Sequence, residues 1–185
     1  CIVLWGQNPA ISTLPEMSGI SALKQKGLKV IVIDPRYTET AAKADLWLPI
    51  RPGTDLALAL AWIHTIIYEG LVDYDFVYNY CVGFDELMVH VEQYSPEWAE
   101  PITGISADLI REGARMYATN RPGNIQWGVA IDQSGKPAGA AMHARAILRA
   151  ITGNLDCPGG DLLTGPSQEF VTDEEMELND MLPEE

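Results

Sequence analysis

The sequence lacks the spacings that mark metal and disulfide sites. Its three cysteines lie far apart and include no Cys-x-x-Cys pair, and its three histidines show no ligand spacing. An odd number of cysteines also gives no sign of a disulfide framework. We therefore predict no metal-ligating residue in this chain, and the composition leaves its cellular compartment unassigned.

Long apolar runs are absent as well. No stretch reaches the roughly eighteen apolar residues that a transmembrane helix needs. The longest apolar helix candidate, Leu56 to Tyr68, contains His64 and is too short to cross a bilayer. The sequence therefore predicts no membrane segment.

Basic residues are scarce relative to acidic ones. The chain has 12 Lys and Arg against 26 Asp and Glu, which gives a formal net charge of -14. Nucleic acids and anionic lipids bind cationic surfaces, so we exclude nucleic acid as a partner. Residues 169–185 carry eight acids and no Lys or Arg, and we interpret 166–185 as an acidic tail or a linker to a further domain.

The length and apolar content fit one domain. The chain has 185 residues, of which 47% are hydrophobic, and residues 1–165 have the size of a single domain with one substantial core. It begins at Cys1, in an apolar run, without a Met or a charged leader. We expect the chain to be a piece of a longer polypeptide.

Strand and helix patterns alternate along the first half. We predict a strand at 1–5, a loop at 6–19, a helix at 20–26 and a strand at 29–33. The two strands are apolar throughout, as expected when both faces of a sheet are covered, and short joints around one helix favour a parallel pair. A short helix at 38–43, a strand at 46–50 and a long helix at 55–69 follow.

The second half is mainly helical by the same criteria. We predict helices at 74–80, 84–92, 106–118 and 138–152, with Ser106 as an N-cap, and a strand at 123–130. Trp127 and Gly128 close that strand and are expected to border a ligand crevice. The five tryptophans are interpreted as packing residues and not as a stacking platform.

Three loops follow the predicted strands, and in an open parallel sheet such loops converge where ligands bind. The first lacks the G-x-G-x-x-G turn of NAD-binding domains but offers Gly6 for close backbone approach and Asn8 as a donor and acceptor. Asn8-Pro9 is equally consistent with a plain turn. The second loop is Asp34-Pro35-Arg36, in which Asp34 suits ribose hydroxyls and Arg36 a phosphate or an acid. An Asp-Pro turn is the alternative.

The third loop is Pro52-Gly53-Thr54-Asp55. Thr54 and Asp55 could simply cap the helix that follows. A carboxylate at Asp55 also suits guanine, whose ring N–H and amine are two adjacent donors, and would select guanine over adenine. Asp34 would then serve the ribose, and Asp55 the base, of one ligand.

Five segments in this order resemble the molybdopterin oxidoreductases related to dimethyl sulfoxide reductase and formate dehydrogenase. They are "WGQNP", "VIVIDPRYTETAAKADLWLPIRPGTDLALALA", "GLVDYDFVYNYCVGFDEL", "ITGISADLIREGARMYA" and "AITGNLDCPGG", and the resemblance covers Cys1 to about Gly160. It implies an α/β, Rossmann-like, doubly wound and mostly parallel sheet flanked by helices. It also implies that this domain holds the guanosine end of one molybdopterin guanine dinucleotide, in enzymes with two such cofactors on one molybdenum or tungsten ion.

The resemblance assigns cofactor contacts to matching positions. Gly6 and Asn8 would approach the diphosphate and guanosine, and Asp34 and Arg36 the ribose region. The guanine would lie against the turn that precedes the long helix, at Gly53, Thr54 and Asp55.

The same resemblance implies what the chain does not contain. The iron-sulfur cysteines and the ligand to the metal normally precede the "WGQNP" position, so we predict no catalytic residue here and an inactive isolated chain. The parent would be an oxidoreductase of anaerobic metabolism. Its remaining domains are the expected partners, and an electron-transfer subunit is a further candidate.

The branch of the family stays open, and so does membership of a different class. Residues 163–168 read Leu-Thr-Gly-Pro-Ser-Gln where formate dehydrogenases carry Arg-Gly-Gln-Asn, which disfavours formate oxidation. "YCVGFDEL", "ARAILRAITGN" and "LPEE" are similar to the acetylene hydratase branch, a non-redox tungsten enzyme. A pterin-free electron-transfer scaffold and a general NAD-binding domain are two further hypotheses for the function of the chain.

Overall fold

The structure is a computed structural model that describes residues 1–132 and 137–163. The predicted acidic tail at 166–185 lies outside the described residues, and so does the departure from formate dehydrogenases from residue 164 onward. Within the described ranges, no helix is long and apolar enough to cross a membrane.

Four short strands form one parallel sheet. The strands are β1 (Ile2–Trp5), β2 (Val30–Ile33), β3 (Leu46–Leu48) and β4 (Asn124–Trp127). Their order is β3-β2-β1-β4, and Val3 pairs with Ile31 on one side and with Ile125 on the other. The predicted parallel sheet is therefore confirmed, with β1 in its interior.

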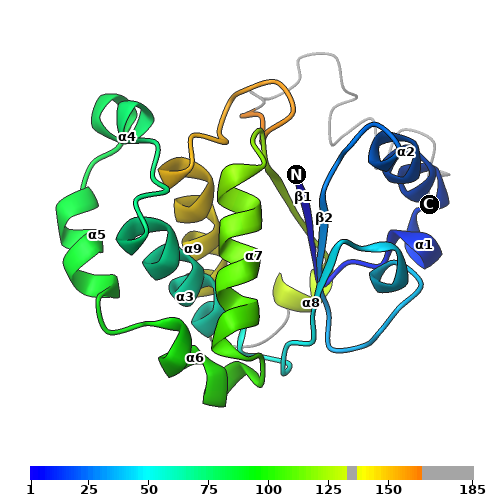
Figure 1. Ribbon diagram of the computed structural model, residues 1–185, viewed down its shortest axis with the longest axis horizontal. Coiled ribbons are helices and arrows are strands. Elements are labelled where there is room, and N and C mark those ends of the chain that lie inside the picture. Colours follow the sequence, from blue (N-terminus) through cyan, green and yellow to red (C-terminus); the bar gives the residue numbers. More distant parts are fainter. Residues whose placement is uncertain (133–136, 164–185) are drawn as a thin grey trace, which may run out of the picture.

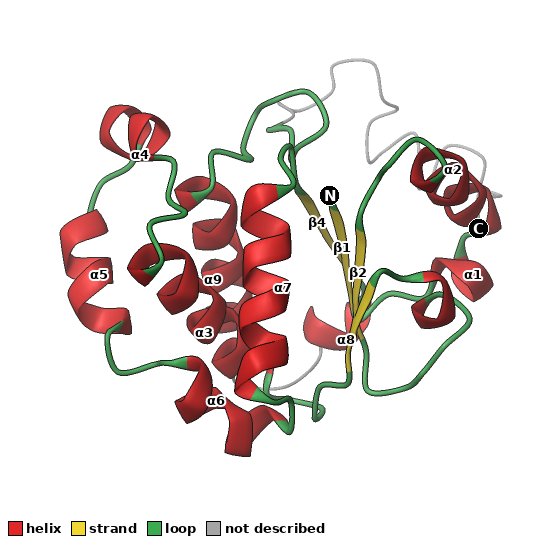
Figure 2. Cartoon of the chain, viewed as in Figure 1, coloured by secondary structure: helices red, strands yellow, loops and turns green. Residues whose placement is uncertain are grey.

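Helices cover both faces of the sheet, as Figures 1 and 2 show. On one face lie α1 (Pro9–Ser12) and α2 (Leu14–Lys24), and on the other lie α3 (Asp55–Tyr68), α7 (Ala107–Thr119) and α9 (Ala138–Ile151). Alternate strand residues face the two sides, so Ile2 and Leu4 pack with Met17 while Val3 and Trp5 belong to the larger core. The Rossmann-like, doubly wound α/β fold is confirmed.

Most predicted helices lie within two residues of their expected bounds. Besides α3, α7 and α9 they are α4 (Tyr74–Tyr80) and α5 (Phe84–Val91). The structure adds α6 (Pro96–Thr103), whose first turn is capped by Ser95, because its side chain accepts a hydrogen bond from the Trp98 amide. Pro101 inside α6 makes this helix hard to predict from sequence.

The predicted loop at 6–19 is wrong, because α1 and most of α2 occupy it. Pro9 and Pro15 lie in the first turns of these helices, where proline is tolerated, and not in breaks between elements. Only Met17 and Ile20 of α2 are buried, so the segment carries almost no apolar periodicity that could have indicated a helix.

Two other boundaries differ from expectation. The segment predicted as a helix at 38–43 is a single 3-10 turn, η1 (Ala41–Lys43), and β3 ends at Leu48 and not at residue 50. The strand predicted at 123–130 ends at Trp127, after which Gly128 leads into the short helix α8 (Val129–Asp132). The carboxyl end of β4 is therefore followed by a sharp change of direction.

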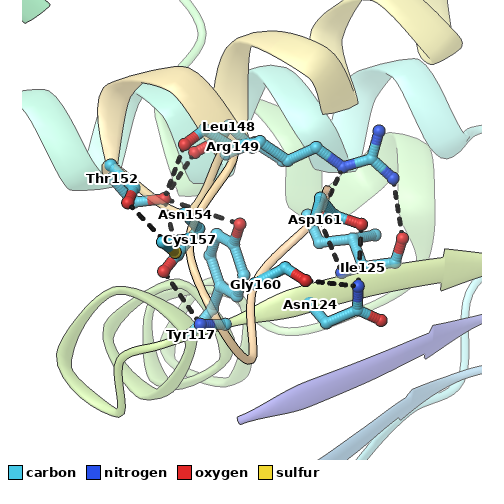
Figure 3. A network of polar contacts seen from close by, with 12 residues as sticks. Tyr117, Asn124, Ile125, Leu148, Arg149, Thr152, Asn154, Cys157, Gly160 and Asp161 are labelled. Atoms are coloured by element: carbon cyan, nitrogen blue, oxygen red, sulfur yellow. Dashed lines mark hydrogen bonds and ion pairs between the residues drawn. The ribbon is translucent and has the colours of Figure 1, made fainter. Parts of the chain in front are cut away.

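A buried polar network holds the glycine-rich loop after α9 against β4 (Figure 3). Asn154 is fully buried, and its Oδ1 accepts from the Gly123 amide at 2.8 Å while its Nδ2 donates to Thr152 Oγ1 at 2.8 Å. Asp161 forms an ion pair with Arg149 at 2.8 Å and accepts from the Asn124 side-chain amide at 2.8 Å. Burial raises the pKa of Asp161 although Arg149 opposes that shift.

Replacing Asn154 by Ala should destabilise the fold by about 2–4 kcal/mol, because it leaves the buried Gly123 amide without its acceptor. Urea unfolding followed by circular dichroism measures this loss. Asn79→Ala is the matched control, since Asn79 is exposed and donates only to a carbonyl of its own helix. Equal stabilities of the two variants would contradict this role for Asn154.

Burial raises the pKa of Tyr117 from 10.0 to about 12. In the unfolded chain this phenol ionises near its ordinary pKa, so its contribution is complete below pH 10 and is lost as the pH rises toward about 12. We expect the free energy of unfolding to fall by about 2–3 kcal/mol over that range. Tyr117→Phe should abolish this share of the decline, whereas Tyr78→Phe, at an exposed position, should retain it.

Candidate functional site

The carboxyl ends of the strands meet at one edge of the sheet. The Gly6 amide donates to the Ile33 carbonyl at 2.8 Å, and the Asp34 amide donates to the Leu48 carbonyl at 3.3 Å. On the other side of β1, the Gly128 amide donates to the Trp5 carbonyl at 3.1 Å. The predicted loops after β1, β2 and β3, together with the loop after β4, therefore lie side by side.

The loops after β1 and β4 are in contact. Between these two strands, the connections of the sheet switch from one of its faces to the other. The connections from β1 to β3 run over the α2 side, and the connection to β4 runs over the α3 side (Figure 1). This is the position where open α/β sheets bind ligands. Gly6 has a φ of 64°, and a Cβ at Gly128 would overlap the Gly6 carbonyl oxygen. Only glycine at both positions allows this approach.

Asn8 is held by a residue from a different loop. Its Oδ1 accepts a hydrogen bond from Thr40 Oγ1 at 2.5 Å, and Thr40 Oγ1 also accepts from the Ala10 amide at 3.2 Å. Thr40 is fully buried. Asn8 is the N-cap residue of α1, but its side chain makes no capping bond. The side-chain oxygen of Asn8 therefore already accepts a hydrogen bond within the protein. The side-chain nitrogen, Nδ2, has no acceptor among the described residues.

Asp34 is 6% exposed, and its Oδ1 accepts from the Arg36 amide at 2.8 Å. The Trp47 indole donates to the Asp34 carbonyl at 2.9 Å, which fixes the backbone of the turn. The Asp-Pro turn considered from the sequence is present. A turn of this kind uses one carboxylate oxygen and leaves the other available. The Arg36 side chain is exposed and forms no ion pair with a described residue.

The third loop places Asp55 in the first turn of α3. Gly53 has a φ of 79°, which suits glycine, and Thr54 Oγ1 donates back to the Arg51 carbonyl at 2.7 Å. Thr54 occupies the N-cap position without capping through its side chain, so the simple capping interpretation is wrong for Thr54. Asp55 Oδ1 accepts from the Trp5 indole at 2.8 Å. The other oxygen, Oδ2, makes no hydrogen bond to a described residue.

The residues that form hydrogen bonds to these side chains could not be predicted from the sequence. Trp5 lies 50 positions from Asp55, and Thr40 lies 32 positions from Asn8. Sequence reasoning also misses Gln7 as a polar group of the site, although Gln7 follows Gly6 directly. The Gln7 Oε1 is buried without a donor among the described residues, while its Nε2 donates to Glu16 at 3.3 Å. Only its position after a strand could have indicated it.

A cavity of about 460 Å³ with mixed polar and apolar lining lies beside β4. Gln7, Gln126, Trp127 and Asp161 are among the residues that line it. Arg145 and Arg149 lie over the Trp127 ring, at 4.2 and 4.6 Å from its centroid. Trp127 lines this cavity, but none of the predicted cofactor contacts does, so its expected place beside the cofactor stays a prediction.

A larger and mostly apolar cavity of about 910 Å³ lies between α3, α4, α5 and α9. Leu56, Leu60, Phe84 and Ile147 are among its lining residues, and it includes none of the predicted cofactor contacts. Within the described ranges, no three His, Cys, Asp or Glu side chains gather to hold a metal ion. The predicted cofactor contacts lie outside both of these cavities.

The strand order and the loops gathered at the carboxyl ends of the strands define a Rossmann-like α/β domain. Residues 1–156 match the family described as molybdopterin oxidoreductase. The chain belongs to this family, and the resemblance carried by its five sequence segments is confirmed.

Relatives within the family carry different names. The chain is 40% identical to acetylene hydratase of Syntrophotalea acetylenica over 100% of its own length, and 39% identical to formate dehydrogenase H of Escherichia coli over 85%. It is 37% identical to the dimethyl sulfoxide reductase DmsA of Escherichia coli over 86%. The solved structure of acetylene hydratase from Pelobacter acetylenicus covers 98% of the chain with a TM-score of 0.85 and 38% identity.

The chain spans about a quarter of the length of these relatives. It covers 25% of the acetylene hydratase, 22% of formate dehydrogenase H and 22% of DmsA. The solved acetylene hydratase chain is covered to 25% as well. The similarity therefore concerns one portion of much longer proteins.

Gly128→Ala should destabilise the fold by about 1–3 kcal/mol, because the new methyl group forces the loops after β1 and β4 apart. Gly139→Ala in the first turn of α9 is the control. A Cβ there meets no atom within 4 Å, and alanine favours a helix, so this variant should be neutral or up to about 1 kcal/mol more stable. Thermal unfolding measures both, and a destabilised Gly139→Ala beside an unaffected Gly128→Ala would contradict the packing at the crevice.

Proposed function

We propose that this chain is the domain that holds the guanosine end of one molybdopterin guanine dinucleotide in a larger molybdenum or tungsten enzyme. The observation that carries the proposal is the Asp55 carboxylate, which accepts a hydrogen bond from the Trp5 indole near the edge where the loops after β1 and β2 begin. The contacts proposed from the sequence, including Arg36, Gly53 and Thr54, belong to the loops at this edge.

The residues present fit the chemistry of a guanine nucleotide. Guanine presents two adjacent donors, and the Asp55 carboxylate is an acceptor whose Oδ2 is not engaged by a described residue. The second oxygen of Asp34 can accept from ribose hydroxyls. Gln7 Oε1 is a buried acceptor without a donor among the described residues, as expected of a group whose partner is a ligand. Gly6 gives the backbone room to approach a diphosphate.

The reaction itself would come from elsewhere. When bound, the cofactor supplies the metal-dithiolene chemistry for oxygen-atom transfer, electron transfer or hydration. This chain contributes binding and orientation of the nucleotide end, and no residue in it is assigned a catalytic or metal-ligating role. The iron-sulfur cluster and the metal ligand would lie in other parts of the parent, and the isolated chain should be inactive.

A non-redox tungsten enzyme similar to acetylene hydratase is the second candidate for the parent. It is favoured by the match over 100% of the chain at 40% identity and by the TM-score of 0.85. The formate dehydrogenase and dimethyl sulfoxide reductase relatives favour an oxidoreductase, with an electron-transfer subunit as a further partner beside the remaining domains. A pterin-free scaffold is disfavoured, because it would have no use for Asn8, Asp34 and Asp55 together at one edge.

Binding of guanine nucleotides tests the proposal. We expect GDP to bind more tightly than ADP or NAD in calorimetric titrations of the cofactor-free protein. Asp55→Asn should weaken GDP binding by about tenfold or more, because an amide replaces one acceptor with a donor. The measurement is best made on this chain and on the full-length polypeptide, expressed in a host that cannot synthesise molybdopterin.

Asp108→Asn is the matched control, since Asp108 also lies in the first turn of a long helix, α7, but is fully exposed to solvent. It should leave GDP binding unchanged. Equal affinities of the full-length protein for GDP, ADP and NAD would refute the assignment of guanosine to this crevice.

A further inference from the structure

We propose that Trp5 is a positioning residue for guanine recognition, acting through Asp55. This inference rests on the proposed function, because it assigns Trp5 a role in the specificity of the same site. The sequence indicates a packing residue at Trp5, and the side chain is indeed buried, with 1% of its surface exposed. Its indole N–H nevertheless makes a directed contact that packing does not require.

The contact joins the end of a central strand to the start of a helix. Trp5 is the last residue of β1 and pairs with Ile33 on one side and Trp127 on the other. Its Nε1 donates to Asp55 Oδ1 at 2.8 Å, within the usual range for a hydrogen bond to a carboxylate. The donor thus has a fixed position in the middle of the sheet, while the acceptor lies in the first turn of α3, beside the carboxyl end of β1.

The Trp5 ring cannot easily move away from Asp55. It packs against Trp62 with ring centroids 5.7 Å apart, and Trp62 in turn stacks on Tyr117 at 6.0 Å. Gly113 also lies against Trp62, where even a Cβ would be only 2.7 Å from the ring. Close packing therefore fixes the indole, and the indole fixes the carboxylate.

Fixing the carboxylate matters because guanine needs a defined arrangement of acceptors. A free aspartate rotates broadly about its terminal torsion. With the indole hydrogen on Oδ1, the plane of the Asp55 carboxylate is set and Oδ2 is left for the ligand. Oδ1 retains a second lone pair and can also accept from guanine.

The indole N–H also determines how Asp55 Oδ1 takes part in hydrogen bonding. Indole N–H is a donor only, so Oδ1 must act as an acceptor toward it. Adenine presents an acceptor, its N1, beside an amine and therefore needs a donor from the protein. Trp5 orients the Asp55 carboxylate, whose two oxygens are acceptors that match the donors of guanine and not N1 of adenine, which deepens the proposed function from binding to specificity.

Trp62 offers a matched control within the same core. It is also fully buried and contacts the Trp5 ring, but its indole nitrogen has no acceptor among the described residues. Trp62→Phe therefore removes ring volume without removing a hydrogen bond to Asp55. Trp5→Phe removes a similar volume together with the donor.

The test titrates the cofactor-free, full-length polypeptide with GDP and with ADP, which shares the ribose and diphosphate but not the guanine. Trp5→Phe should weaken GDP binding on the order of tenfold, corresponding to the loss of one charge-assisted hydrogen bond, and leave ADP binding unchanged. Trp62→Phe should change both affinities by the same factor or neither. In the Asp55→Asn background, Trp5→Phe should have no further effect on GDP.

Each outcome decides between specific possibilities. If Trp5→Phe lowers GDP and ADP affinity equally, or leaves GDP binding intact while Asp55→Asn weakens it, Trp5 is a packing residue only and this inference fails alone. If the unsubstituted protein does not prefer GDP, the proposed function fails and this inference fails with it. A loss confined to GDP in Trp5→Phe supports both.

Discussion

The register of β1 with its two neighbours is the constraint on which the rest of the structure depends. Because all pairings are parallel and Trp5 lies level with Ile33 and Trp127, three strands end at the same height. Gly6, Asp34 and Gly128 follow directly and meet at one edge, although they are far apart in sequence. A shift of one residue would also exchange the residues that face the two cores.

Local sequence patterns determine how much of the fold could be predicted. Strands covered on both faces are apolar throughout, and α3 is apolar around most of its circumference, so both produce strong local signals. The helix α2 buries only two residues and begins at a proline turn, and α6 contains an internal proline. In α2 the local apolar pattern is therefore sparse, and in α6 the Ser95 cap and the burial of Ala99 and Thr103 accompany a proline that argues against a helix.

The candidate site likewise has residues that could be predicted from the sequence and contacts that could not. Gly6, Asp34 and Asp55 could be selected because each follows a predicted strand, and the chemistry of carboxylates suggested ribose and guanine. The contacts that orient them could not, since Trp5 to Asp55 and Thr40 to Asn8 are pairings between distant segments. Trp5 illustrates the difficulty best: its burial was predictable from its apolar surroundings, whereas the direction of its N–H depends on the position of α3.

Similarity to the relatives does not assign one reaction to this chain. Acetylene hydratase, formate dehydrogenase H and DmsA differ in their named chemistry, yet their identities to this chain lie between 37% and 40%. If this portion determined the reaction, one relative should stand well apart from the others. The near-equal identities therefore single out none of these three reactions for this chain. The hydrogen bonds at the carboxyl ends of the strands orient Asp55, Asp34 and Asn8, as the proposed binding of a nucleotide requires.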